Sequence, residues 1–462
     1  MLDKKSIKKQ LVIIGFDEIV SNKYIDIINN AIENSIISCY SIIDLKTVKT
    51  EISRRIKKLK VPPKNELYIS NYNSNDVVVK ELNCLFNQIK SKCSDDIVVY
   101  IATELKSHLF YLQYCILNKY DCLIEKPIFA TFKRGQFYPH KIKTTMNSLL
   151  KKSLRCNLNI SVMTLARYHP IYNDILIKNL KKNVKKLKTP ITSINMNVKG
   201  GVWNLHDEYI NREDHPYKYG YGMLMHGAYH YIDIFSQLLE LNKLLYKNTK
   251  LDLYIKTYAA YPFDQNERIS KLKEKNFNDI LPNFKQKNMR FHFGETDFVA
   301  VFKLVNRETS SIITIGTLSF EQTTVSLRTW KEFPKDVYNK NGRISSVDIG
   351  VELSTLYSIT TNCYDVPSKE DNIDKIGAEA VVREIKNYKL LDDSVPFSKK
   401  TYEGVFHNIS NKKVMKNWIE GKENKSKFSS HKNVMSIIGC IGESLYKNGK
   451  EMKVEVEYPD EL

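Results

Sequence analysis

The sequence predicts an α/β domain with a parallel sheet, followed by an α+β domain with a large, mainly antiparallel open sheet. Two observations predict this order. Short apolar runs rich in β-branched residues, at 11–15, 36–43 and 97–102, alternate with helical segments, as the buried strands of a parallel sheet do. From residue 190 onward, apolar and polar residues alternate along longer segments, which is typical of antiparallel strands with one solvated face.

Length and composition allow both domains. The chain has 462 residues, 42% of them hydrophobic and 11% aromatic, which suits a globular protein with two cores rather than a disordered one. No apolar run reaches the roughly 18–20 residues that span a membrane. The first 16 residues contain no signal-peptide hydrophobic region. We therefore expect a cytoplasmic protein without membrane contact.

The formal net charge of +19 raises the question of a nucleic-acid partner. Basic residues cluster at 54–60 and 181–188, but no helix-turn-helix, zinc-finger or RNA-recognition signature accompanies them. A solvated basic face is therefore favoured over a nucleic-acid surface, and an anionic small substrate stays open. The eight cysteines form no Cys-x-x-Cys pair and no zinc spacing, so we expect them to be reduced and structural.

A dinucleotide-binding half is predicted at the start of the chain. Strand 11–15, helix 23–33 and strand 36–43 are followed by Asp44, the order of a Rossmann domain in which the acid binds the adenosine ribose. Of the G-x-G-x-x-G pattern, however, the chain keeps only Gly15, and Asp17 and Glu18 follow. Like charges about 4 Å apart repel by roughly 4 kcal/mol at an effective dielectric near 20. Either these carboxylates turn away from a pyrophosphate, or the cofactor sits differently, or none binds.

The segment 97–131 predicts a strand, a helix over 108–117 and a strand over 122–124 that ends in Glu125-Lys126-Pro127. Ligands of open parallel sheets lie outside the carboxyl ends of the strands, so Thr103 and this tripeptide face the expected site. The Lys126 ammonium can hydrogen-bond a substrate hydroxyl or stabilise an alkoxide, and Pro127 fixes the turn. Taken alone, the tripeptide also fits a strand that simply ends in a charged turn.

The rest of the chain is assigned more coarsely. We expect a loop at 132–140, helices at 141–152 and 433–446, and strands at 157–166, 191–198, 298–305, 311–320, 323–330 and 452–456. Glycines at 200 and 201 are expected to break the strand before them. Residues near 335–430 form an unplaced insertion of mixed pattern. The predicted domains are 1–153, dinucleotide-binding, and 154–462, for substrate and oligomerisation.

A second group of ionisable residues lies at 220–233. If the chain is helical from about Met225, then His226, His230 and Asp233 lie on one face. Three such residues on an otherwise apolar helix mark a cleft. The two histidines also have metal-chelating spacing, but no glutamate follows the first and no third ligand is near, so no metal site is predicted. His226 alone also fits a buried histidine satisfied by a backbone carbonyl.

Several motifs together resemble the Gfo/Idh/MocA family of nicotinamide-dependent oxidoreductases. These are Ala102-Thr103 at a strand end, His108 five residues later, Glu125-Lys126-Pro127, His230-x-x-Asp233 and a final helix, Gly449-Lys450 turn and strand. The resemblance spans residues 11–456. The sequence departs from the family at the glycine loop and at His226, where the family has an aspartate.

The resemblance implies NAD or NADP as cofactor, with NAD mildly preferred because Asp44 would repel a 2′-phosphate. The cofactor would be held by Gly15, Asp44, Thr103, His108, Glu125, Lys126 and Pro127. His230 would be the general acid/base and Lys126 would polarise the substrate oxygen. The remaining candidates are His226, which could hydrogen-bond a substrate hydroxyl, and Arg167, Tyr168 and Asp233, expected near the substrate.

The expected activity is hydride transfer between the nicotinamide and a secondary alcohol or ketone of a sugar, cyclitol or nucleotide-linked sugar. By the same resemblance, the large sheet is expected to pack across subunits of a homo-oligomer. The alternative is a catalytically lapsed member that binds a ligand or a partner protein, since the glycine loop and His226 depart from the family pattern.

Overall fold

The computed structural model describes residues 9–70, 75–92, 95–204, 206–213, 215–269, 293–325, 345–367, 376–391, 395–405 and 408–457. The chain divides into two compact units. The first unit comprises Met1–Ala130, Thr144–Tyr168 and Asn408–His431. The second unit comprises Thr131–Lys143, His169–His407 and Lys432–Leu462. A late segment of the chain thus completes the first unit.

The first unit contains a six-stranded sheet in the order β3-β2-β1-β4-β5-β8. Every neighbouring pair in it is parallel, so the predicted Rossmann-type sheet is confirmed. The strands are β1 (Lys9–Ile14), β2 (Ile37–Leu45), β3 (Asn65–Ile69), β4 (Asp96–Ile101), β5 (Asp121–Ile124) and β8 (Ile160–Val162). Because β1 and β4 are buried on both faces, they read as continuous apolar runs in the sequence.

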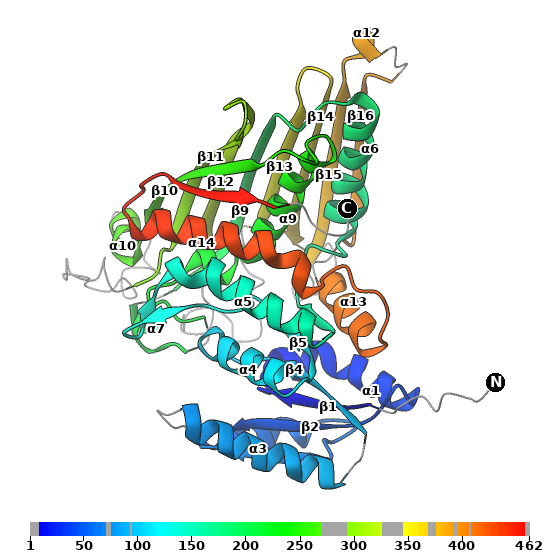
Figure 1. Ribbon diagram of the computed structural model, residues 1–462, viewed down its shortest axis with the longest axis vertical. Helices are drawn as coiled ribbons and strands as arrows, with labels where there is room; N and C mark the ends of the chain where they lie inside the picture. Colours follow the sequence, from blue (N-terminus) through cyan, green and yellow to red (C-terminus); the bar gives the residue numbers. More distant parts are fainter. Residues whose placement is uncertain are drawn as a thin grey trace. The chain divides into compact units, whose positions relative to one another are not determined.

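Helices complete this unit (Figure 1). They are α1 (Ile25–Glu33), preceded by a π-helical turn over Val20–Tyr24, α2 (Lys49–Ile56), α3 (Asn75–Lys92), α4 (Leu105–Leu117), α5 (Ile142–Arg155), which begins in the second unit, and α13 (Asn408–Ile419). The core joins Tyr24 and Tyr100 with Trp418 of α13. This explains part of the region that the sequence left unplaced, because α13 packs against α1.

The second unit is built on a nine-stranded sheet in the order β16-β15-β14-β13-β9-β12-β11-β10-β17. Its neighbouring strands are antiparallel except for β9 and β12, which are parallel. The predicted large, mainly antiparallel sheet is therefore confirmed. The strands are β9 (Ser193–Trp203), β10 (Leu251–Ala260), β11 (Asp297–Asn306), β12 (Ile312–Val325), β13 (Ser346–Leu353), β14 (Tyr357–Pro367), β15 (Ile376–Lys386), β16 (Phe397–Glu403) and β17 (Met452–Val456).

Four expectations for this unit change. β9 continues through Gly200 and Gly201 to Trp203, and the glycines are accommodated by shifts in its pairing with β12 rather than by a break. The region near 335–430 supplies β13, β14, β15 and β16, which widen the sheet. The expected loop at 132–140 contains a short hairpin of β6 (Phe132–Lys133) and β7 (Gln136–Phe137). Of the strand expected at 323–330, only 323–325 lie within the described residues, where they end β12.

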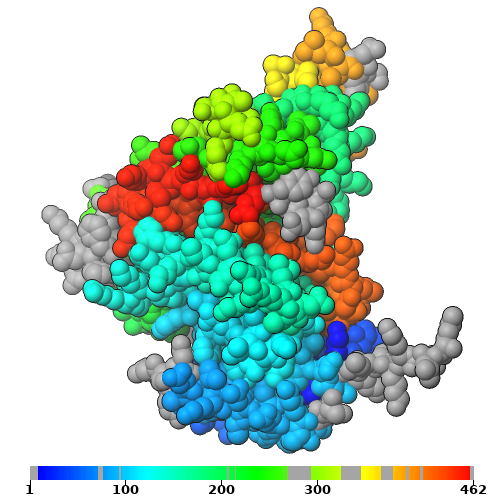
Figure 2. All heavy atoms as spheres, viewed as in Figure 1, coloured from blue at the N-terminus to red at the C-terminus, as the bar shows by residue number. Residues whose placement is uncertain are grey.

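One face of the sheet carries the helices of this unit. They include α6 (Lys178–Leu187), α9 (Tyr229–Leu241) and α14 (Lys432–Tyr446). Of these, α14 contacts α9, β10 and β17. The shorter helices are α7 (His206–Asn211), α8 (Met223–His226), α10 (Pro262–Ile269) and α12 (Tyr388–Leu391). The carboxyl-terminal segment, red in Figure 2, lies at the surface of this unit. In the part of the chain that the structure describes, no helix combines the length and apolarity needed to cross a membrane.

Candidate functional site

In the first unit, Gly15 stands at the end of β1 in a conformation that glycine adopts readily. Its φ is +88°, and a Cβ at this position would lie 2.6 Å from the carbonyl oxygen of Ala102 at the end of β4. Its N–H donates to the carbonyl of Ile43 in β2, at 2.9 Å. The three strand ends therefore meet at Gly15, and a side chain there would be strained twice over.

Asp44 lies at the end of the neighbouring strand and holds the turn after Gly15. Its Oδ2 accepts a hydrogen bond from the Phe16 N–H at 2.8 Å, and its Oδ1 accepts one from the Leu45 N–H at 2.7 Å. Burial raises the pKa of Asp44, and these N–H groups and Arg55 partly offset that rise. A carboxylate that already accepts two hydrogen bonds keeps lone pairs for a ribose hydroxyl.

Asp17 caps the helical segment that follows the Gly15 turn. Its Oδ1 accepts a hydrogen bond of 2.9 Å from the Val20 N–H, and its side chain is exposed. A helix amino terminus is where the pyrophosphate of a dinucleotide binds in a Rossmann domain. A carboxylate of the chain itself therefore uses one of the N–H groups of that terminus, and the three alternatives that Asp17 and Glu18 raised in the sequence stay open.

At the end of β5, Glu125, Lys126 and Pro127 form the expected turn, with a cis peptide bond between Lys126 and Pro127. Glu125 Oε1 accepts a hydrogen bond of 2.6 Å from the Tyr100 hydroxyl of β4. Burial raises the pKa of Glu125, and the Tyr100 hydroxyl and the Lys126 charge partly offset that rise. Lys126 is half-buried, just beyond the carboxyl end of β5.

His108 joins the ends of β4 and β5. Its Nδ1 lies 2.7 Å from the Pro127 carbonyl oxygen and its Nε2 lies 2.7 Å from that of Thr103. A neutral imidazole donates through one nitrogen and an imidazolium donates through both. Burial lowers the pKa of His108, and the hydrogen bonds to the two carbonyls partly offset this decrease. Beside it, Thr103 Oγ1 is buried and has no hydrogen-bond partner among the described residues. Such a hydroxyl is available to a ligand.

In the second unit, the expected continuous helix from Met225 is interrupted. α8 ends at His226, and α9 begins at Tyr229 after Gly227 and Ala228. His226 therefore belongs to a separate turn, whereas His230 and Asp233 both lie in α9 and are buried. The described structure thus brings together the last two of the three expected residues on one helix and presents the first from an adjoining one.

Aromatic rings surround His226. The centroids of Tyr217, His215 and Tyr221 lie 4.8, 5.2 and 5.4 Å from that of the His226 ring, each close to perpendicular. Such edge-to-face packing holds an imidazole in one orientation. The position that carries an aspartate in the resembling family is therefore an aromatic-packed histidine here.

Glu295 is a buried carboxyl that the sequence analysis did not identify. Its Oε1 accepts a hydrogen bond of 2.7 Å from the Leu224 N–H, and its backbone carbonyl accepts one of 2.9 Å from the Met223 N–H, so it caps α8. Burial raises its pKa to about 7, although backbone N–H groups oppose the change. Gly222 is needed for this approach, because a Cβ there would lie 2.0 Å from the Glu295 carbonyl oxygen.

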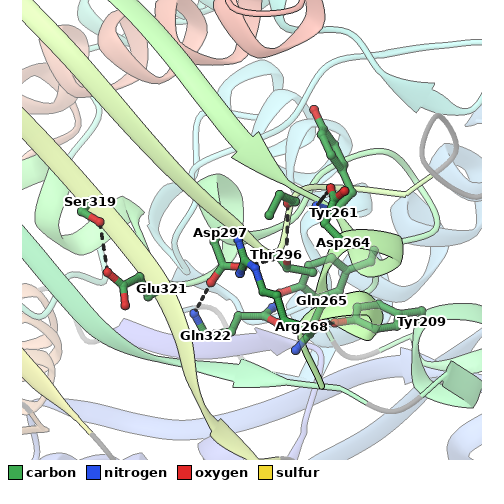
Figure 3. A network of polar contacts seen from close by, with 12 residues as sticks. Tyr209, Tyr261, Asp264, Gln265, Arg268, Thr296, Asp297, Ser319, Glu321 and Gln322 are labelled. Carbon is green, nitrogen blue, oxygen red and sulfur yellow. Dashed lines mark hydrogen bonds and ion pairs between the residues drawn. The ribbon is translucent and has the colours of Figure 1, made fainter. Parts of the chain in front are cut away.

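A polar network supports the Tyr217 ring that packs on His226, and Figure 3 shows Gln322, Asp297 and Arg268 of this network. Gln322 donates through Nε2 to the Tyr217 hydroxyl and through its backbone N–H to Asp297 Oδ1, at 2.7 Å for the latter. Arg268 of α10 pairs with Asp297 Oδ2 at 2.8 Å. The network thus ties α10, β11 and β12 to the ring that packs on His226.

Arg167 and Tyr168 contact the late segment of the first unit. Arg167 donates to the Ser430 carbonyl at 3.1 Å, and the Tyr168 N–H donates to Ser410 Oγ at 3.0 Å. These contacts attach the late segment 408–431 to the end of the first unit. A role in substrate binding stays a prediction for both residues.

Across the described residues, no group of three or more His, Cys, Asp or Glu side chains is placed to hold a metal ion. The seven cysteines that the structure describes are free. Cys93 lies outside the described residues.

Comparison with known proteins gives a fold. No protein-family model matches the sequence, and no curated protein matches it. Levoglucosan dehydrogenase in complex with NADH and levoglucosan matches with a TM-score of 0.54 at 11% identity, covering 98% of this chain and 100% of that one. An oxidoreductase from Agrobacterium radiobacter in complex with NAD+, L-tartaric acid and magnesium matches at 0.51 and 10%, covering 97% and 98%.

The WlbA dehydrogenase from Bordetella pertussis in complex with NADH and UDP-GlcNAcA matches at 0.50 and 12%, covering 97% of this chain and 99% of that one. At such identities the likeness is one of fold. Over almost its whole length, the chain therefore has the two-part fold that these oxidoreductases share.

Proposed function

We propose that this chain is an NAD(P)-dependent oxidoreductase that interconverts a secondary alcohol and a ketone on a sugar-like small molecule. One observation carries the proposal. Asp44, Gly15, Thr103 and Lys126 lie at or within two residues of the carboxyl ends of the four adjacent strands β2, β1, β4 and β5. In doubly wound sheets, the crevice outside such strand ends is where dinucleotides bind.

The fit of a dinucleotide to the first unit is good at the strand ends. The absence of a side chain at Gly15 lets the ends of β1 and β4 pack closely, Asp44 has lone pairs for the adenosine ribose, and the Thr103 hydroxyl lacks a partner among the described residues. When bound, NAD(P) would supply the hydride acceptor or donor. The proposed holding residues also include His108, Glu125, Lys126 and Pro127, with NAD mildly preferred because a carboxylate at Asp44 repels a 2′-phosphate.

The reacting groups are assigned by their chemistry. Lys126 would hydrogen-bond the substrate oxygen and stabilise the negative charge that develops on it. His230 would hold and release the hydroxyl proton, since an imidazole titrates near neutral pH. His226, Asp233, Arg167 and Tyr168 are proposed to orient the substrate.

A sugar-like substrate is supported by two of the structural neighbours. One of them is in complex with levoglucosan and the other with UDP-GlcNAcA. The net charge of +19 is compatible with an anionic group on such a substrate. We further propose a homo-oligomer in the cytoplasm, with subunits packed through the open face of the nine-stranded sheet.

The experiment that tests the proposal is a titration of the purified full chain with NADH and NADPH, followed by nicotinamide fluorescence. Micromolar binding would support a working cofactor site and justify screening sugars and cyclitols for turnover. Absence of binding up to millimolar nucleotide, by protein with a cooperative unfolding transition, would overturn the oxidoreductase proposal.

A second candidate function is a lapsed enzyme that binds a ligand or partner protein. It is favoured by one observation, the hydrogen bond from the Val20 N–H to Asp17, because that carboxylate stands where a pyrophosphate would bind. The two candidates separate in an Asp17→Gly variant. If this variant binds NADH and the natural chain does not, the cleft has lost its cofactor and the second candidate holds.

A further inference from the structure

The second unit contains a cavity of about 600 Å³, a volume in the range that small-molecule sites occupy. It lies between the β6–β7 hairpin, the end of β10, the start of α10 and the carboxyl end of α14. None of the residues assigned above to cofactor, catalysis or substrate lines it. The cavity therefore does not contain those residues, although its lining residue Glu295 also caps α8, the helix that ends at His226.

Aromatic residues make up five of the fifteen described lining residues. They are Phe137, Tyr258, Tyr261, Phe293 and Tyr446. Tyr258 and Tyr446 are 62% and 59% exposed. In Figure 3, Tyr261 points away from the Tyr209 and Gln265 pair, and its backbone N–H donates to Asp264 at 2.9 Å. The face of an aromatic ring is negative, so it attracts cations as well as apolar groups.

The charge of the lining is opposite to that of the chain. The sequence has 71 lysine and arginine residues against 52 acidic ones, yet none of the described lining residues is a lysine or an arginine. The lysine near a lining ring is Lys256, whose Nζ lies 5.6 Å from the centroid of the Tyr258 ring. The one carboxyl of the described lining is Glu295, which is 5% exposed. An anionic ligand would face this carboxyl without a basic residue in the described lining, so anions are disfavoured.

Glu295 has hydrogen bonds but no ion pair with any residue that the structure describes. Its pKa is raised to about 7 by burial, and the opposing influences are backbone N–H groups, not a neighbouring cation. The negative charge of Glu295 contributes to raising the pKa of the Tyr217 hydroxyl. A carboxylate buried without a counter-ion is costly, and a cation placed beside it would relieve that cost.

We propose that this cavity binds a small organic cation, a quaternary ammonium or protonated amine, between its aromatic walls and the Glu295 carboxylate. Aromatic faces combined with a carboxylate are the chemistry that recognises alkylammonium groups. A neutral ligand of the same shape would keep the contacts with the rings but leave the charge of Glu295 uncompensated. The proposal does not depend on nicotinamide binding or on turnover.

The test compares choline with its neutral carbon isostere, 3,3-dimethylbutan-1-ol, by calorimetric titration of the full-length protein at pH 8, where Glu295 is ionised. We expect choline to bind about tenfold or more tightly than the isostere, which equals about 1.4 kcal/mol. Glu295→Gln should abolish that preference, because glutamine can still accept the Leu224 N–H but has no charge. Tyr446→Leu should weaken both ligands by removing one wall.

Glu308→Gln is the matched control, because Glu308 is an exposed carboxylate in the turn between β11 and β12, and it should leave choline binding unchanged. Equal affinity for choline and the isostere would overturn the proposal in favour of a merely apolar pocket. An unchanged preference for choline in Glu295→Gln would also overturn it. The same holds if folded protein does not bind choline at concentrations of about 10 millimolar, which corresponds to a binding free energy of about 2.7 kcal/mol. Each outcome is read from cation binding, so failure of the NADH titration leaves it intact.

Discussion

The carboxylate of Asp44 accepts a hydrogen bond of 2.8 Å from the backbone N–H of Phe16, the residue that follows Gly15. The end of β2 thereby fixes the turn that leaves β1. Arg55 supports the same turn by donating to the Phe16 carbonyl at 3.0 Å. Asp44, which would bind the adenosine ribose, thus also holds the loop that would approach the pyrophosphate. The ribose and pyrophosphate parts of the proposed site therefore depend on the same side chain.

Replacing Asp44 by alanine should therefore weaken nucleotide binding through two losses, the ribose contact and the fixed turn. We expect the dissociation constant for NADH to rise about tenfold to a hundredfold, as for loss of one or two hydrogen bonds to a charged group. Nicotinamide fluorescence measures it. Asp26→Ala is the control, since Asp26 is an exposed acid on α1; equal weakening by both variants would contradict a specific role for Asp44.

Gly15 allows a test of the close approach of β1 and β4. Gly15→Ala should lower the free energy of unfolding by about 2–4 kcal/mol, because positive φ and a backbone clash each cost of the order of 1–3 kcal/mol. Gly421→Ala, in the same unit, shares a positive φ of +66°, but its Cβ would meet nothing closer than Lys9 Nζ at 3.9 Å. Urea unfolding should show the smaller loss for Gly421→Ala; similar losses would mean that the clash with Ala102 is relieved by backbone movement.

Lys126 separates binding from chemistry. Lys126→Ala should reduce kcat with any sugar substrate found by at least about a hundredfold, the usual effect of removing one group that stabilises developing negative charge. NADH affinity should change far less. Lys126→Arg keeps the charge but not the compact shape of the ammonium, so it should restore part of the rate. A rise in KM at constant kcat would instead assign Lys126 to uniform substrate binding.

Much of the first unit could be predicted from the sequence, because the signals for its strands are local. A buried parallel strand is a continuous apolar run, and the strand ends at Gly15, Asp44 and Lys126 follow directly from such runs. The contribution of α13 could not be found this way. Its packing on α1 joins parts of the chain nearly 400 residues apart, and nothing in its own pattern names its partner.

In the candidate site, too, some residues carry a local sequence signal and others do not. Asp17 carries a local signal, since an aspartate before a helical segment is a favoured cap, and the cap is what the structure contains. Glu295 carries none. Its raised pKa results from burial against the turn before α8, and that burial depends on the close backbone approach that Gly222 permits. The interruption between α8 and α9 is equally tertiary, because Gly227 and Ala228 would also be compatible with a continuous helix.

Glu295 should leave a signature in the pH dependence of stability. Its pKa in the folded chain is raised from 4.5 to about 7 by burial, so between these values the folded state holds a proton that the unfolded state releases. Stability from this group is full below about pH 4.5 and is lost as the pH rises to about 7. Relative to Glu295→Gln, which does not titrate, the natural chain should lose up to about 3 kcal/mol across that interval. Urea unfolding at pH 5, 6, 7 and 8 measures the difference, and parallel curves for the two proteins would show that Glu295 is ionised throughout.

The open face of the nine-stranded sheet is the proposed subunit contact. Val301 of β11 and Ile315 of β12 are 49% and 55% exposed, and they lie on adjacent strands whose buried residues alternate with them. Apolar side chains on the broad outer face of a sheet favour association, and a charge directed into such a contact opposes it. The double variant Val301→Asp, Ile315→Asp should therefore shift the mass measured by light scattering toward the 53.8 kDa of one chain.

Leu117→Asp is the control, because Leu117 is 80% exposed at the end of α4 in the first unit. An oligomer that survives the double variant would place the contact elsewhere, and a natural chain that is already monomeric would leave this face to a different partner.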